Sequence, residues 1–104
     1  MADSKLYLTL FLYLHEGEEA TFLEYEDQVL PMLAKYKGEL IYRIRPEITN
    51  FVQPSAEYPY EIHLISFSSA QDFENFRQDK ERLALFPLFQ KSVRKVLLLP
   101  SPEV

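Results

Sequence analysis

A chain of 104 residues has the length of one domain, and we expect a single domain over residues 1–104. Hydrophobic residues make up 47% and aromatic residues 14% of the sequence, which is enough apolar material to exclude a disordered chain. The chain has no cysteine, which excludes disulfides and thiolate chemistry, and its net charge of −5 with scattered Lys and Arg argues against a nucleic-acid partner.

The first predicted strand lies within Lys5–His15, KLYLTLFLYLH. Leucines occupy every second position of this segment, so one face of the strand is aliphatic and the other carries aromatic and hydroxyl side chains. The run is too short to span a bilayer, and no small-residue cleavage site follows it. We therefore expect a cytoplasmic protein without a membrane partner.

The second element is a helix predicted over Glu18–Lys37, where apolar residues recur every three or four positions. Pro31 removes one backbone hydrogen bond, so a kink is expected near Asp27–Gln28. Gly38 is placed to take the left-handed position that ends a helix.

Two alternating segments, Glu39–Pro46 and Tyr60–Phe67, predict the next two strands. In the first of them, alternation places Leu40, Tyr42 and Ile44 on one face and Ile41, Arg43 and Arg45 on the other. The connection Glu47–Pro59 carries several apolar side chains, so we expect it to fold back over the rest of the chain.

The last third predicts a helix, a break and a final strand. Ser68 or Ser69 caps the helix that starts there, and a break near Asp79–Glu81 precedes a second helical piece containing Pro87. The one-turn spacing of Asp79 and Arg82 indicates a cap or an ion pair. Lys95–Leu99 is the last predicted strand, ended by Pro100 and Pro102.

The resulting order, β-α-β-β-α-β, predicts an α+β fold, the ferredoxin-like plait with a four-stranded antiparallel sheet. The first and third strands are expected at its centre, with both helices on one face, over the leucines of the first strand. Several apolar side chains are then left on the open face: Tyr7, Thr9, Phe11, Tyr13, Ile41, Ile65 and Phe67. Exposed apolar surface of that extent marks a partner, and a second copy packed face to face, a homodimer, is the simplest one.

The C-terminal segment contains Ser66-Phe67-Ser68-Ser69, the pair Phe73 and Phe76, and the series Asp79, Arg82, Leu85, Pro87 and Leu88. With these residues the segment resembles the dimeric α/β-barrel superfamily, in particular a small family of unknown function related to antibiotic-biosynthesis-monooxygenase-like and stress-responsive proteins. The resemblance implies a dimer and a cleft between sheet and helices, and no single reaction.

The candidate site is a polar cluster placed by alternation on one sheet face. Its expected ligand-binding residues are Tyr13, Glu61, His63, Arg43 and Arg45, of which His63, Tyr13 and Arg43 are the catalytic candidates. The alternative interpretation is an ion-pair set of Glu61 with Arg43 or Arg45 beside a satisfied histidine. His15 and His63 lack the spacing of a metal-binding pair, so no metal or other cofactor is expected.

Two functions remain open at this stage. In the first, the protein is a non-catalytic dimer whose sheet face serves self-association and, in addition, small-molecule binding. In the second, it is a cofactor-independent monooxygenase- or isomerase-like enzyme acting on a small aromatic or apolar acid. The aromatic stripe Tyr7, Phe11, Tyr13 and Phe67 would be dimer core in the first case and pocket wall in the second.

Overall fold

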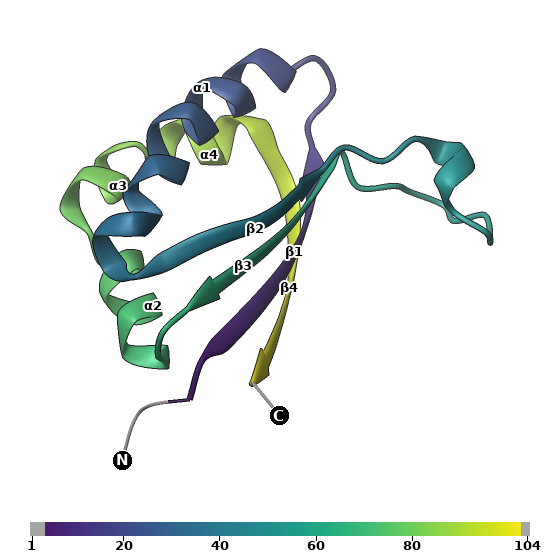
Figure 1. The fold of residues 1–104 in the computed structure, drawn as a ribbon. Coiled ribbons are helices and arrows are strands. Elements are labelled where there is room, and N and C mark those ends of the chain that lie inside the picture. Colours follow the sequence, from purple (N-terminus) through teal and green to yellow (C-terminus); the bar gives the residue numbers. More distant parts are fainter. Residues whose placement is uncertain (1–3, 103–104) are drawn as a thin grey trace.

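The predicted order of strands and helices is present in the computed structural model, which describes residues 4–102 (Figure 1). The strands are β1 (Leu6–Leu14), β2 (Gly38–Ile44), β3 (Glu61–Phe67) and β4 (Val93–Pro102). The α-helices are α1 (Glu19–Val29), α2 (Ala70–Arg77), α3 (Lys80–Ala84) and α4 (Phe86–Ser92), and the 3-10 helices are η1 (Leu30–Tyr36) and η2 (Ile48–Asn50).

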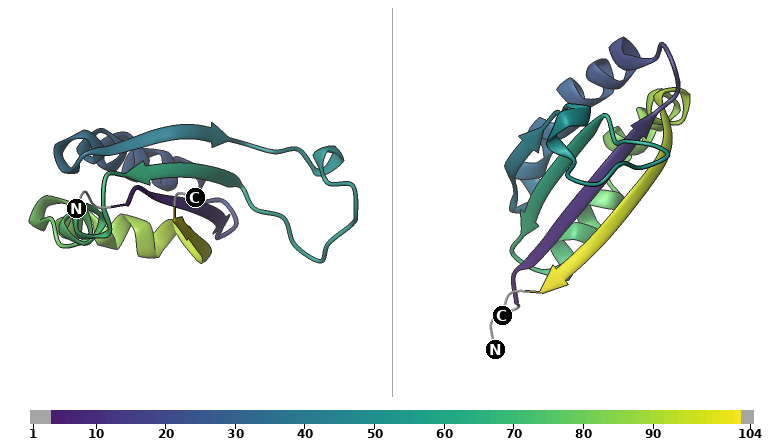
Figure 2. Two further views of the ribbon diagram at one scale, coloured as in Figure 1. Left: turned by 60° about the horizontal axis from the view of Figure 1, so that its bottom comes forward. Right: turned by 90° about the vertical axis from the view of Figure 1, so that its right-hand side faces the viewer.

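The four strands form one antiparallel sheet in the order β2-β3-β1-β4, so β1 and β3 are central as predicted. The helices α1 to α4 and η1 all lie over one face of the sheet, and within residues 4–102 the other face carries no helix (Figures 1 and 2). This arrangement confirms the ferredoxin-like plait.

The core lies between the helices and the leucine face of β1. Leu8 and Leu12 are each 2% exposed, and they pack in two adjoining clusters with Tyr25, Val29 and Phe22 of α1. Alternation along β1 therefore places its aliphatic side under the helices, as the sequence indicated.

The prediction that Ile65 and Phe67 lie on the open face of the sheet is wrong. Leu8 pairs with Ile65 and Leu6 with Phe67, and paired residues share a face, so both β3 side chains lie under the helices. They are buried at 7% and 1% exposure within the core. The sequence gives the alternation within each strand, but the register between strands decides which side of β3 meets the core.

A β-bulge in β2 changes which of its side chains share a face, so the predicted alternation over the whole strand is wrong. Leu40 pairs with Ile65 and Tyr42 with Leu64, which leaves Ile41 as the extra residue. Leu40 therefore packs against the core, whereas Tyr42 and Ile44 lie on the open face. Beyond the bulge Arg43 pairs with His63, which brings the arginine to the helix side.

The predicted kink takes the form of a change of helix type. The α-helix ends at Val29 and continues as the 3-10 helix η1, whose first turn contains Pro31, where the missing N–H has no consequence. Lys37, with φ of 59°, takes the left-handed position expected of Gly38. Gly38 is needed instead for close approach, because a Cβ there would lie 2.8 Å from Cε1 of Phe67.

The N-caps of α2 and α3 agree with the prediction from the sequence, and the last strand is longer than expected. The hydroxyl of Ser69 accepts a hydrogen bond from the backbone N–H of Asp72, and the carboxylate of Asp79 accepts one from that of Arg82. β4 continues through Pro100 and Pro102 because it is an edge strand, where a missing N–H need not break a ladder.

The β2–β3 connection projects beyond the end of the sheet (Figures 1 and 2), contrary to the expectation that it folds back over the chain. Within it the rings of Phe51 and Tyr58 contact each other with their centres 4.9 Å apart and their planes inclined by 57°, and Val52 is fully exposed. Its second limb is fixed to β4 by ion pairs of Glu57 with Arg94 and Lys95.

Candidate functional site between the sheet and helix α1

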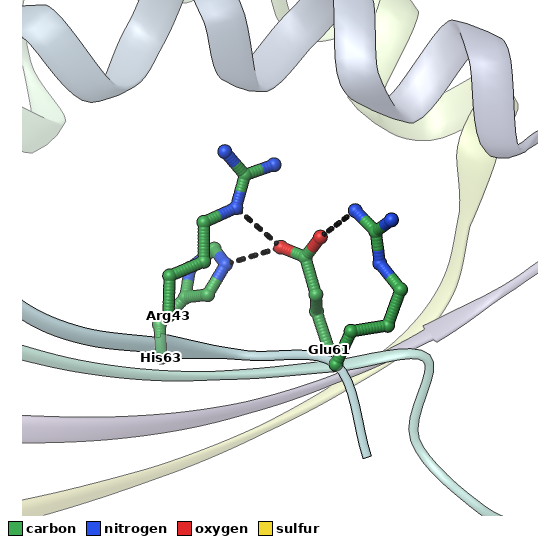
Figure 3. A network of polar contacts seen from close by, with 4 residues as sticks. Arg43, Glu61 and His63 are labelled. Atoms are coloured by element: carbon green, nitrogen blue, oxygen red, sulfur yellow. Dashed lines mark hydrogen bonds and ion pairs between the residues drawn. The ribbon is translucent and has the colours of Figure 1, made fainter. Parts of the chain in front are cut away.

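A buried carboxylate, Glu61, is the centre of a polar network on the helix side of the sheet (Figure 3). Its side chain is 1% exposed and accepts hydrogen bonds from Arg43 Nε at 2.8 Å, Arg45 Nη2 at 2.6 Å and His63 Nε2 at 2.7 Å. The bulge in β2 makes this possible, because it turns both arginines toward the same face as Glu61 and His63.

The network keeps Glu61 ionised. Burial by itself would raise its pKa, but the hydrogen bonds from His63, Arg43 and Arg45 outweigh that effect and lower the pKa to about 2. An ionised carboxylate can only accept hydrogen bonds, so Nε2 of His63 carries the proton in this contact. Glu61 therefore fixes the ring orientation of a histidine that is only 2% exposed, with Nε2 as the nitrogen that donates to it.

Tyr13 does not belong to this network. It pairs with Lys95 of β4 on the open side of the sheet, whereas His63 pairs with Leu10 on the helix side. Tyr13 is buried by its own chain, with Lys95 Nζ 4.9 Å and the Arg94 guanidinium 5.8 Å from the ring centre. Of the five predicted site residues, the structure thus brings together Glu61, His63, Arg43 and Arg45.

A small cavity of about 80 Å³ lies beside His63, between the sheet and the helices. Its walls are mostly apolar, and four side chains with polar groups line it: Tyr25 and Glu26 from α1, His63 from β3 and Arg82 from α3. Arg82 also lines a second hollow of about 320 Å³ toward β4, which shares Leu10 and Phe89 with the first.

Glu26 is the titratable group that the sequence analysis missed. It is 5% exposed, and none of the ion pairs or side-chain hydrogen bonds among residues 4–102 uses its carboxyl group. Burial raises its pKa to about 7, and the nearby charges of His63 and Arg43 only partly oppose that rise. A carboxyl group with that pKa exchanges protons near neutral pH, which is the property required of a general acid or base.

A signal for Glu26 was present in the sequence. The residue lies four positions after Phe22 and three before Val29, on the apolar stripe of α1. A carboxylate on the buried side of an amphipathic helix is unusual unless it is paired or functional.

The part of the chain that the structure describes contains no group of three or more metal-ligating side chains that could hold an ion. In the same range, none of the helices is long and apolar enough to cross a membrane.

Comparison with known proteins finds similarity in structure rather than in sequence. No protein-family model matches the chain, and no curated protein matches it. A protein of unknown function from Rhodopseudomonas palustris superposes with a TM-score of 0.84 at 12% identity, over 98% of this chain and 84% of that one. A DABB family protein with a ferredoxin-like fold from Mesorhizobium loti superposes with a TM-score of 0.71 at 11% identity, over 98% of this chain and 99% of that one.

A third solved structure, a dimeric protein of unknown function with a ferredoxin-like fold from Bacteroides fragilis, gives a TM-score of 0.69 at 8% identity, over 95% and 96% of the two chains. Further neighbours are described as a NIPSNAP family protein and an antibiotic biosynthesis monooxygenase-like protein. At these identities the likeness concerns the fold. It shows the ferredoxin-like fold that the resemblance implied.

Proposed function

We propose that the protein is a homodimer in which the open face of the sheet is the contact surface. All four strands contribute apolar side chains to this face, including Phe11 of β1, Tyr42 and Ile44 of β2, Leu64 of β3, and Leu97 and Leu99 of β4. Tyr42 is 60% exposed and Leu99 is 57% exposed. Apolar side chains exposed on all four strands of one sheet face are typical of an interface, and this surface carries the proposal.

A second copy suits this surface better than an unrelated partner does. In a two-fold dimer the same surface of each copy meets the other, so the apolar face of one chain would cover that of its partner. Lys95, a charge on this face, is already paired with Glu57 within the chain. The Bacteroides fragilis neighbour with the same fold is described as dimeric, which also favours this partner.

The test is the mass in solution of the native protein and two aspartate variants. The wild type is expected at twice the 12.3 kDa chain mass in sedimentation equilibrium. Leu97→Asp should sediment as one chain, because a charge buried in the contact would lose its solvation. Leu83→Asp on α3 is the matched control, since Leu83 is similarly exposed on the helix side, and it should remain dimeric. A wild type that sediments as one chain refutes the dimer.

We infer a second, catalytic candidate from the cavity beside His63. An apolar pocket with a few convergent polar groups is typical of a small-molecule site, and Glu26 and His63 can supply proton transfer. The chemistry that this favours is that of a cofactor-independent, isomerase- or monooxygenase-like enzyme acting on a small aromatic or apolar acid. Binding of such acids, measured by the rise in melting temperature of the purified dimer, tests whether the pocket takes this class of ligand.

A further inference from the structure

Arg82 and Glu26 both line the cavity, and Nε of Arg82 is a buried atom without a hydrogen-bond acceptor among the described residues. The carboxyl group of Glu26 is buried as well, and it takes part in none of the ion pairs among those residues. Buried polar groups in folded proteins are almost always hydrogen-bonded, so an exception at a cavity wall indicates a ligand. Arg82 is otherwise fixed, with Nη1 donating to the Arg77 carbonyl at 3.1 Å and the guanidinium 5.1 Å from the ring centre of Phe76.

From this geometry we propose that Arg82 and Glu26 form the recognition site for the carboxylate of a small apolar organic acid, and that Glu26 is protonated when the acid is bound. The proposal rests on the ligand-binding function inferred above and extends it with a substrate class, two site residues and a coupled proton. It does not depend on the dimer, because the cavity lies on the helix side, away from the open face.

The groups around the cavity select an acid. Arg82 offers a cationic N–H donor, and a guanidinium pairs with a carboxylate more strongly than with a neutral acceptor. The walls contributed by Leu10, Phe76 and Phe89 are apolar and suit a hydrocarbon or aromatic body. The inner cavity of about 80 Å³ and the adjoining hollow of about 320 Å³ both reach Arg82, so the carboxylate can lie at Arg82 while the apolar body extends from it.

A carboxylate bound beside Glu26 would be repelled by an ionised glutamate, so a neutral carboxyl group that donates a hydrogen bond is the compatible form. The burial that raises the pKa of Glu26 to about 7 already favours this form. The titratable and charged groups facing Glu26 come from four elements: Tyr25 of α1, Arg43 of β2, Glu61 and His63 of β3, and Arg82 of α3. The negative charge of Glu61 is neutralised by Arg43 and Arg45. Glu26 is therefore the group whose protonation we expect to change when the carboxylate binds.

The experiment measures binding of benzoate and of neutral benzamide by calorimetry at pH 6 and pH 8, on either side of the Glu26 pKa of about 7. Benzoate should bind the wild type more tightly than benzamide, and its affinity should fall about tenfold from pH 6 to pH 8 as Glu26 ionises. At pH 8, calorimetry in buffers of different ionisation enthalpy should show proton uptake on binding.

Two variants assign the effect to the two residues. Glu26→Gln is close in shape to the protonated acid, and it should bind benzoate with no dependence on pH over this range. Arg82→Gln should lose the preference for benzoate over benzamide, whereas Arg77→Gln, at an exposed arginine of α2, should keep it. Circular dichroism of each variant establishes that a loss of binding is not a loss of fold.

The outcomes separate this proposal from the more general one. If benzoate and benzamide bind equally and Arg82→Gln changes neither, the pocket binds ligands but the carboxylate site is refuted. If Glu26→Gln keeps the pH dependence of the wild type, the protonated glutamate is refuted. If the wild type binds neither compound, both the carboxylate site and the proposed ligand-binding function fall, while the dimer is judged by sedimentation alone.

Discussion

Replacing Glu26 by Gln should make the protein more stable at alkaline pH and leave its stability almost unchanged at acid pH. The carboxyl group is 5% exposed, and its pKa rises from the usual 4.5 to about 7 in the folded chain. Below pH 4.5 it is protonated in both the folded and the unfolded state and contributes no pH dependence. As the pH rises from there to 7, the unfolded chain releases the proton and the folded chain retains it, so stability falls.

The magnitude follows from the same two pKa values. At 1.36 kcal/mol per pKa unit, a rise from 4.5 to about 7 corresponds to about 3 kcal/mol of stability lost once the group is fully ionised. This is a large share of the 5–15 kcal/mol that typically separates folded from unfolded states in a domain of this size. A group retained at that cost is consistent with a functional role.

The assay is urea unfolding of the wild type and Glu26→Gln between pH 5 and pH 8. The variant should gain about 2.5 kcal/mol over the wild type across that range, most of it between pH 5 and 7, because part of the loss has already occurred at pH 5. Glu61 and Asp79, whose pKa values are held near 2, change their contribution only at lower pH and cancel in the comparison. Glu24→Gln, on the exposed side of α1, is the control and should follow the wild type. A difference between wild type and Glu26→Gln that stays constant with pH refutes a raised pKa at this position.

Two further substitutions test the fold around the site. Glu61→Ala should lower the free energy of unfolding by about 2 kcal/mol, because the buried His63 loses its acceptor, whereas Glu57→Ala, in a surface ion pair, should cost less than about 1 kcal/mol. Urea unfolding measures the free energy of both variants. Equal losses would show that the burial of Glu61 and His63 does not make their contact more stabilising than the surface ion pair of Glu57. Gly38→Ala should cost about 1–3 kcal/mol, because its Cβ would lie 2.8 Å from Cε1 of Phe67, and a melting temperature equal to the wild type would contradict the close packing seen here.

Local patterns in the sequence were sufficient for the architecture. The alternating leucines of β1 predicted its core face, because neighbouring side chains of a strand point to opposite sides whatever the strand pairs with. The helix caps at Ser69 and Asp79 were predictable for a similar reason, since a cap is a contact between residues three apart. Connection rules then gave the strand order, with β1 and β3 at the centre.

The candidate site could be predicted only in part. The contact of Glu61 with Arg43 and Arg45 was expected from alternation on adjacent strands, and these side chains do meet. Tyr13 was placed with them because the register between β1 and β3 was not known, and a shift of one residue moves a side chain to the opposite face. The bulge at Ile41 was also invisible, since nothing in the local pattern of β2 marks an extra residue.

The sequence by itself determined which elements form and in what order they pair, because these depend on local periodicity, capping and the short reach of connections. Only the tertiary structure decided which face of β3 meets the helices and that Glu26, Arg82 and His63, from three elements, surround one cavity. The physical reason is that the pKa of a carboxyl group and the partners of a guanidinium depend on how far packing removes them from water. The degree of burial is set when the helices pack on the sheet, so the sequence of a single segment does not determine it.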